Sequence, residues 1–262
     1  MENLKRIILM LIVAAVTLFS LPSCLGDDDL VNDPNYSLDN VWLAIATVVP
    51  QGGNVFYLRL DNGKTLWPAA TNYPDYEPKE NQRAFVSFTI LSDSIQGFAH
   101  YIKLNGIHDI LTKQIAPDMG AANDSIYGTD PVDIPGVENV WVGDGYLNFY
   151  FIVKQGGQKA HYINLIQPDA ENDPYMVEFR HHAKGDPAIS SGSGRVAFNL
   201  ASLPDTKGKT VDLKMKVRTF SGERTYTVKY NTDKTALYET ENGGLGDNSI
   251  SNASGFENGN IQ

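Results

Sequence analysis

Residues 211–218 read Val-Asp-Leu-Lys-Met-Lys-Val-Arg, and this stretch decides the fold class. Apolar and charged side chains alternate along it without interruption. Because successive side chains of a β-strand point to opposite faces of the sheet, the pattern predicts a strand with one buried and one solvated face. Ser221-Gly222 follows as a turn, and the alternation resumes at Tyr226, Val228 and Tyr230. The clearest element of the chain is therefore an antiparallel hairpin.

Short β-rich runs separated by turns precede this hairpin, and they begin near residues 140, 147, 160, 175 and 195. We expect Gly192-Ser193-Gly194 to form a flexible loop between two of them. Six or more short antiparallel strands joined by turns are typical of a β-sandwich. Residues 137–238 are therefore predicted to form an antiparallel β-sandwich domain.

The first half of the chain gives about five further strands, beginning near residues 41, 55, 65, 84 and 99. Asn62-Gly63 lies between two apolar runs and is a strong hairpin signal, because both turn residues must tolerate a positive φ. We expect a short helical turn near 107–111. Residues 40–111 are predicted to form a first all-β domain.

Residues 112–136 break the strand pattern with several prolines, glycines and aspartates. A long irregular segment inside one compact domain is unusual, so this stretch is interpreted as a linker between the two domains. Residues 239–262 are rich in Gly, Asn and Ser and poor in apolar residues, and we expect a disordered tail there.

The N-terminus has the order of a secretory signal: Lys5 and Arg6, then an apolar run over 7–21, then small residues. Cys24 follows Leu-Pro-Ser at the end of this run, which resembles a bacterial lipobox whose cysteine is acylated. Residues 1–23 are then a signal peptide, and Cys24 anchors the mature chain to the membrane through lipid. The alternative is an incidental cysteine removed with the signal. Cys24 is the only cysteine of the chain, so no intrachain disulfide can form.

Asp27, Asp28 and Asp29 come directly behind this cysteine. Like charges in a run repel one another and do not pack, so residues 24–39 are predicted to be a solvated acidic tether. The run also resembles the surface-export signal of Bacteroidota lipoproteins, which implies an outer-membrane protein exposed at the cell surface. The alternative is a plain linker on a protein that faces the periplasm.

The formal net charge of −10 belongs to the flanks of the chain. Residues 40–238 hold 21 acidic and 19 basic residues, so the predicted folded part is nearly neutral. Nucleic-acid binding is therefore not expected.

Several stretches together resemble the NigD-like lipoproteins of Bacteroidota. They are the lipobox, the acidic run, Val41-Trp42-Leu43-Ala44, 56–63, 146–149, 177–182 and 195–200 with Leu203. The resemblance covers nearly all of the mature chain. It implies an N-terminal OB-type β-barrel and a C-terminal β-sandwich, and it brings no established activity and no catalytic residues. The gene neighbourhood behind the family name suggests a bacteriocin-associated accessory or immunity-type role.

Motifs that carry chemistry are weak throughout. His181 and His182 are adjacent on an expected strand and point to opposite faces, while His100, His108 and His161 are scattered. Asp169, Glu171 and Asp173 lack the glycine and glutamate of an EF-hand loop, and residues 191–194 do not fit a serine nucleophile elbow. We therefore predict no catalytic residues, no metal site and no cofactor.

An OB-type barrel can bind oligosaccharides or oligonucleotides on one face, and aromatic side chains suit the stacking of such ligands. Trp67, Tyr73 and Tyr76 lie at a strand end and in a Pro-rich loop, and are the candidate ligand-binding aromatics. The alternative is that they fold back onto the barrel. Lys214, Lys216 and Arg218 line one strand face, which suits an anionic partner or a solvated sheet face equally well.

The sequence therefore predicts a lipid-anchored, all-β, two-domain envelope protein that is not an enzyme. We expect it to act as a binding module for a glycan, a peptide or an envelope protein. The alternatives are the accessory or immunity-type role and a hydrolase with dispersed carboxylates.

Overall fold

The computed structural model describes residues 40–92, 94, 95 and 97–234, all of which belong to a single compact unit. The signal peptide, Cys24, Asp27–Asp29, the tether and the C-terminal tail lie outside the described residues. No helix within the described ranges is long and apolar enough to cross a membrane.

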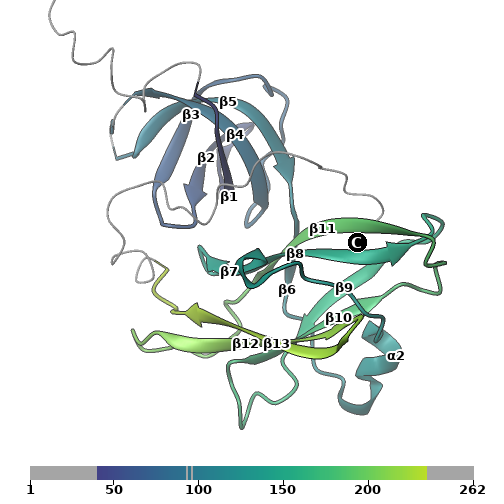
Figure 1. Cartoon of the computed structure of the whole chain (residues 1–262). Helices are drawn as coiled ribbons and strands as arrows, with labels where there is room; N and C mark the ends of the chain where they lie inside the picture. Colours follow the sequence, from purple (N-terminus) through teal and green to yellow (C-terminus); the bar gives the residue numbers. More distant parts are fainter. Residues whose placement is uncertain (1–39, 93, 96, 235–262) are drawn as a thin grey trace, which may run out of the picture. The chain divides into compact units, whose positions relative to one another are not determined.

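The first five strands close into a barrel in the order β1-β2-β3-β5-β4 (Figure 1). Their bounds are β1 Trp42–Gly52, β2 Val55–Leu60, β3 Thr65–Thr71, β4 Arg83–Ser92 and β5 His100–Asp109. β3 and β5 pair in parallel, and the other neighbours are antiparallel. Inward-facing apolar side chains such as Leu58, Leu66 and Ile102 are fully buried and fill the barrel. The predicted OB-type barrel is confirmed.

Eight strands then form two four-stranded sheets, with orders β13-β12-β10-β9 and β6-β11-β8-β7 (Figure 1). Their bounds are β6 Leu111–Gln114, β7 Val140–Gly143, β8 Tyr146–Gln155, β9 Tyr162–Ile166, β10 Met176–His182, β11 Ser190–Asn199, β12 Val211–Thr219 and β13 Gly222–Tyr230. Phe149 lies at the centre of the shared core, with its ring centroid 4.8 Å from that of Phe179 and 5.9 Å from that of Phe198. The predicted β-sandwich is confirmed, and so is the alternation over 211–218, where Leu213, Met215 and Val217 are buried.

Residues 112–136, expected as a linker, carry ordered parts of the sandwich. β6 pairs in parallel with β11, and Val132 and Ile134 lie in the sandwich core. Between them come the 3-10 turn η2 Gly120–Ala122 and the short helix α2 Asn123–Tyr127, while η3 Val137–Asn139 precedes β7. The stretch looks irregular in sequence because its strand pairing is brief and its partners are distant in the chain.

Two local expectations were wrong. Residues 107–111 do not form a helical turn. Residues 107–109 end β5 and pair with β4, where Phe85 is the partner of His108, and Leu111 begins β6. Residues 192–194 are part of β11, where Gly192 pairs with Val153. In both places the cross-strand ladder overrides the local preference of the residues.

A buried polar network joins the barrel to the sandwich, and we call it the junction network. It consists of Thr47, Asp61 and Arg83 from the barrel and Asp144 and Asn148 from the sandwich. Arg83 is fully buried, forms an ion pair with Asp61, and donates through Nη1 to Thr47 Oγ1 at 3.0 Å and through Nε to Asn148 Oδ1 at 3.3 Å. Thr47 Oγ1 donates in turn to Asp144 Oδ2 at 2.5 Å. The two domains therefore meet through matched polar groups and not only through apolar surface.

Candidate functional site

The three candidate aromatics do not form one group. Tyr73 is 39% exposed. Tyr76 folds back onto the barrel, where its hydroxyl donates to Asp109 Oδ1 at 2.6 Å and its ring packs against Phe56. Burial and the neighbouring Asp109 carboxylate raise the pKa of Tyr76, so this hydroxyl stays protonated. Tyr76 therefore has a structural role.

Trp67 belongs instead to an aromatic cluster, formed by Tyr57, Trp67, Phe98 and Tyr101. Phe98 is its centre, with ring centroids 5.6 Å from Tyr57, 5.2 Å from Trp67 and 6.2 Å from Tyr101. The contacts are tilted or edge-on, which is the favoured geometry between aromatic rings. All four side chains are half-buried, so each keeps part of its ring surface in solvent.

Strand register places this cluster on the outside of the barrel. Tyr57, Trp67 and Tyr101 alternate with buried neighbours on β2, β3 and β5, and Trp67 is the parallel partner of Tyr101. Phe98 comes from the short turn before β5, where Ile95 and Phe98 form an isolated bridge. The sequence identifies Trp67 alone, because the parallel pairing of β3 with β5 cannot be read from local patterns.

A second candidate site is a polar pocket of about 240 Å³ on the sandwich. Its floor is the outward face of β10, β12 and β13, and its walls are α2 and residues 128–130. The charged side chains that line it are Asp124, Asp130, Glu178, Arg180, Lys216, Arg218 and Glu223. The predicted basic strand face of Lys216 and Arg218 thus forms part of a pocket that carries both signs of charge.

Close packing of the backbone shapes one wall of this polar pocket. Gly128 has a φ of 79°, and a Cβ there would lie 2.5 Å from the carbonyl oxygen of His181. Asp130 N donates to the same oxygen at 3.0 Å, and Val132 N donates to Arg218 O at 3.0 Å. Residues 128–132 are thereby held across the ends of β10 and β12.

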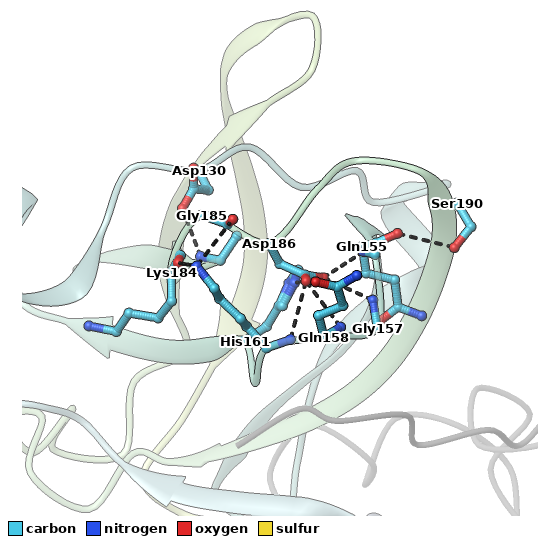
Figure 2. A network of polar contacts seen from close by, with 12 residues as sticks. Asp130, Gln155, Gly157, Gln158, His161, Lys184, Gly185, Asp186 and Ser190 are labelled. Carbon is cyan, nitrogen blue, oxygen red and sulfur yellow. Dashed lines mark hydrogen bonds and ion pairs between the residues drawn. The ribbon is translucent and has the colours of Figure 1, made fainter.

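A third feature is a buried network around Asp186 (Figure 2). Its carboxylate accepts the backbone N–H groups of Gly156, Gly157, Gln158 and Lys159 at 2.5–3.2 Å, and it lies 3.3 Å from His161 Nε2. Burial by itself would raise the pKa of Asp186, but these hydrogen bonds outweigh it and lower the pKa to about 2. Asp186 therefore remains ionised and fixes the turn between β8 and β9.

His161 also contacts His181, with Nδ1 and Nε2 2.9 Å apart. Both rings are buried. Desolvation, and then the neighbouring His161, lower the pKa of His181 to about 4, so this imidazole is neutral at neutral pH. The sequence misses this pair, because only the strand register brings residue 161 beside residue 181. His182 points to the other face, as expected, with Nδ1 3.6 Å from Asp130 Oδ2.

The remaining sequence candidates have ordinary surroundings. Asp169 and Glu171 are exposed, and Asp173 pairs with Lys214 at 2.9 Å. His100 and His108 lie on β5 of the barrel, apart from the buried histidine pair. Within the described part of the chain, no group of three or more His, Cys, Asp or Glu side chains is arranged to hold a metal ion.

Two family models match consecutive parts of the chain. Residues 45–110 match the NigD-like N-terminal OB domain, and residues 114–230 match the NigD-like C-terminal β-sandwich domain. No curated protein matches the sequence.

Three solved structures illustrate the likeness. One, from Parabacteroides distasonis and described as a candidate toxin-related protein, is 64% identical, has a TM-score of 0.72 and covers 76% of this chain and 97% of its own. A NigD-like immunity protein from Bacteroides caccae is 21% identical, with a TM-score of 0.58 and coverages of 74% and 99%. A candidate lipoprotein from Bacteroides fragilis is 12% identical, with a TM-score of 0.52 and coverages of 74% and 100%. The last two show a shared fold alone.

Proposed function

The chain belongs to the NigD-like family, and from this premise we propose that it is a lipid-anchored envelope protein whose barrel binds a glycan. The aromatic cluster carries the proposal. Four half-buried rings from three neighbouring strands and one turn present a fixed apolar surface, on a barrel type that binds oligosaccharides on its strand face. Sugar rings have apolar faces that suit such a surface.

Fixed rings favour binding because little freedom remains to be lost when the ligand arrives. Phe98 contacts each of the other three rings, so the cluster is largely ordered before binding. The barrel is also not a basic surface, since residues 40–111 carry six acids and five bases. A neutral glycan fits both features better than nucleic acid does. The proposed role is binding without catalysis.

The cluster also has a purely structural interpretation, in which its rings only shield the barrel wall. A titration of the full-length protein with short neutral oligosaccharides, in a detergent without a sugar headgroup, separates the two. Trp67→Ala and Tyr101→Ala should each weaken binding about tenfold, which corresponds to about 1.4 kcal/mol. Tyr73→Ala is the matched control, because it removes an exposed aromatic outside the cluster. Binding that is absent from the unaltered protein, or equal in all three folded variants, would contradict the proposal.

The proposed location is the outer membrane, facing the cell surface. It is supported by Cys24 behind an apolar run and by the aspartates that follow it. Cys24→Ala should release the protein from the membrane fraction, and asparagine at Asp27, Asp28 and Asp29 should make it resistant to protease added to intact cells. A periplasm-facing lipoprotein would be protected from that protease before and after the change.

An accessory role beside a toxin is a second candidate, because the 64% identical structure is described as a candidate toxin-related protein. Deletion of the gene should then lower the survival of cells that meet the toxin or bacteriocin of their own strain. The variants of the aromatic cluster should restore survival if this role does not use glycan binding.

A further inference from the structure

The polar pocket on the sandwich has a charge arrangement that identifies a ligand class. Five of its seven charged side chains are paired with one another. Arg180 Nη1 lies 2.6 Å from Asp124 and its Nη2 lies 3.2 Å from Glu178, while Lys216 Nζ lies 2.9 Å from Glu223. These groups neutralise each other across the floor and one wall.

Two opposite charges are left over, and they are Arg218 and Asp130. Arg218 is an exposed side chain on β12, and no ion pair joins it to an acid within the described ranges. Asp130 uses Oδ2 to accept the N–H of Ala183 at 2.7 Å and lies 3.6 Å from His182, but it has no lining cation as a partner. One cation and one anion therefore face the same pocket without neutralising each other.

The pairing of Arg180 is also incomplete. Its side chain is only 13% exposed, and its Nε is buried without a hydrogen-bond partner among the described residues. A buried guanidinium with an unsatisfied donor is unusual in a folded protein and marks a place where a polar group is missing. It lines the same pocket, on the strand next to that of Arg218.

We propose that this pocket binds a small zwitterion, either a free amino acid or a whole short peptide. The ligand carboxylate pairs with Arg218, whose planar guanidinium can form two parallel hydrogen bonds to it. The ligand ammonium pairs with Asp130. The pocket volume of about 240 Å³ suits a ligand of this size, and its near balance of charge disfavours a strongly charged one. This site is separate from the aromatic cluster, which lies on the barrel.

Calorimetric titration of the full-length protein in detergent tests the proposal. The probes are single amino acids and trialanine, together with the N-acetylated and C-amidated forms of whichever probe binds. Saturable binding is expected for the zwitterion, and blocking either charge should weaken it by about tenfold or more. The proposal would be overturned if none of these probes bound saturably, or if the blocked forms bound as tightly as the zwitterion. This first test needs only the unaltered protein.

Variants then locate the site. Arg218→Ala and Asp130→Asn should each weaken binding by about tenfold. Asparagine keeps an oxygen that can accept the Ala183 N–H, so the pocket wall should hold. Lys229→Ala is the matched control, because Lys229 is an exposed cation of the same sheet that pairs with Asp212 away from the pocket. Variants that fold, as judged by their melting temperatures, and bind as the unaltered protein does would place the zwitterion elsewhere and overturn the assignment.

Discussion

Arg83 of β4 and Asp61 of the turn after β2 form an ion pair in which both side chains are almost completely buried. Asp61 also accepts the indole N–H of Trp141 from the sandwich at 2.8 Å. A buried charge is costly when it loses its partner, because water does not replace that partner. The pair therefore links the stability of the barrel to that of the sandwich.

Arg83→Ala should lower the free energy of unfolding by about 3–5 kcal/mol, because it leaves the Asp61 carboxylate buried without its cation. Urea denaturation followed by fluorescence measures the change. Lys229→Ala breaks the exposed pair with Asp212 and should cost less than about 1 kcal/mol. Similar losses of unfolding free energy in the two variants would mean that burial does not determine how much each ion pair contributes to stability.

Stability should fall as the pH is lowered from about 6.5 towards 4. The pKa of His181 is about 4 in the folded protein, which is below the ordinary value of 6.5, so the unfolded chain binds this proton more tightly. The contribution of His181 to stability is fully present above pH 6.5. Between pH 6.5 and pH 4 the free energy of unfolding should fall by an amount on the order of 3 kcal/mol. Denaturation at several pH values measures it.

His181→Gln is the control for this pH dependence. It removes the titrating group and should flatten the curve between pH 6.5 and 4. A further loss below about pH 3.8 should persist, because the lowered pKa of Asp186 makes its stabilisation vanish as the pH falls towards 2. If the free energy of unfolding of His181→Gln still fell equally steeply between pH 6.5 and pH 4, another titrating group would be responsible for that fall.

Asp186→Ala should loosen the turn between β8 and β9. The carboxylate accepts four consecutive backbone N–H groups, and these lose their shared acceptor in the variant. Hydrogen exchange measured by NMR should become faster for the amides of residues 156–159. The amides of β12 and β13 serve as the internal reference and should keep their protection relative to the global stability.

Gly128→Ala should destabilise the protein by about 1–3 kcal/mol, because the new Cβ would meet the His181 carbonyl oxygen at 2.5 Å in addition to the strain of a positive φ. Gly157→Ala is matched, with a φ of 75° and nothing within 4 Å of the added Cβ. It should cost only about 1 kcal/mol. Equal melting temperatures for the two variants would show that the wall beside β10 can move.

The period-two pattern of 211–218 predicts its strand well, since one face of it is buried and the other solvated. Local patterns fail where the structure depends on distant partners. Residues 192–194 look flexible but pair with β8, and residues 112–136 look like a linker although Val132 lies in the core. The aromatic cluster and the buried histidine pair are hidden for the same reason, because Trp67 meets Tyr101, and His161 meets His181, only through strand register.

The parallel pairing of β6 with β11 has a consequence for the order of events during synthesis. β6 follows the barrel directly, but its only strand partner in the described sheet emerges much later. The barrel strands lie close together in the chain and can assemble early, whereas β6 must wait with its backbone groups unpaired until β11 has been made. Pairing between strands that are so far apart in the sequence is slow to form. A chain that emerges N-terminus first would therefore pass through a state with a finished barrel and an open sheet edge, and an unpaired edge of this kind can pair with other chains.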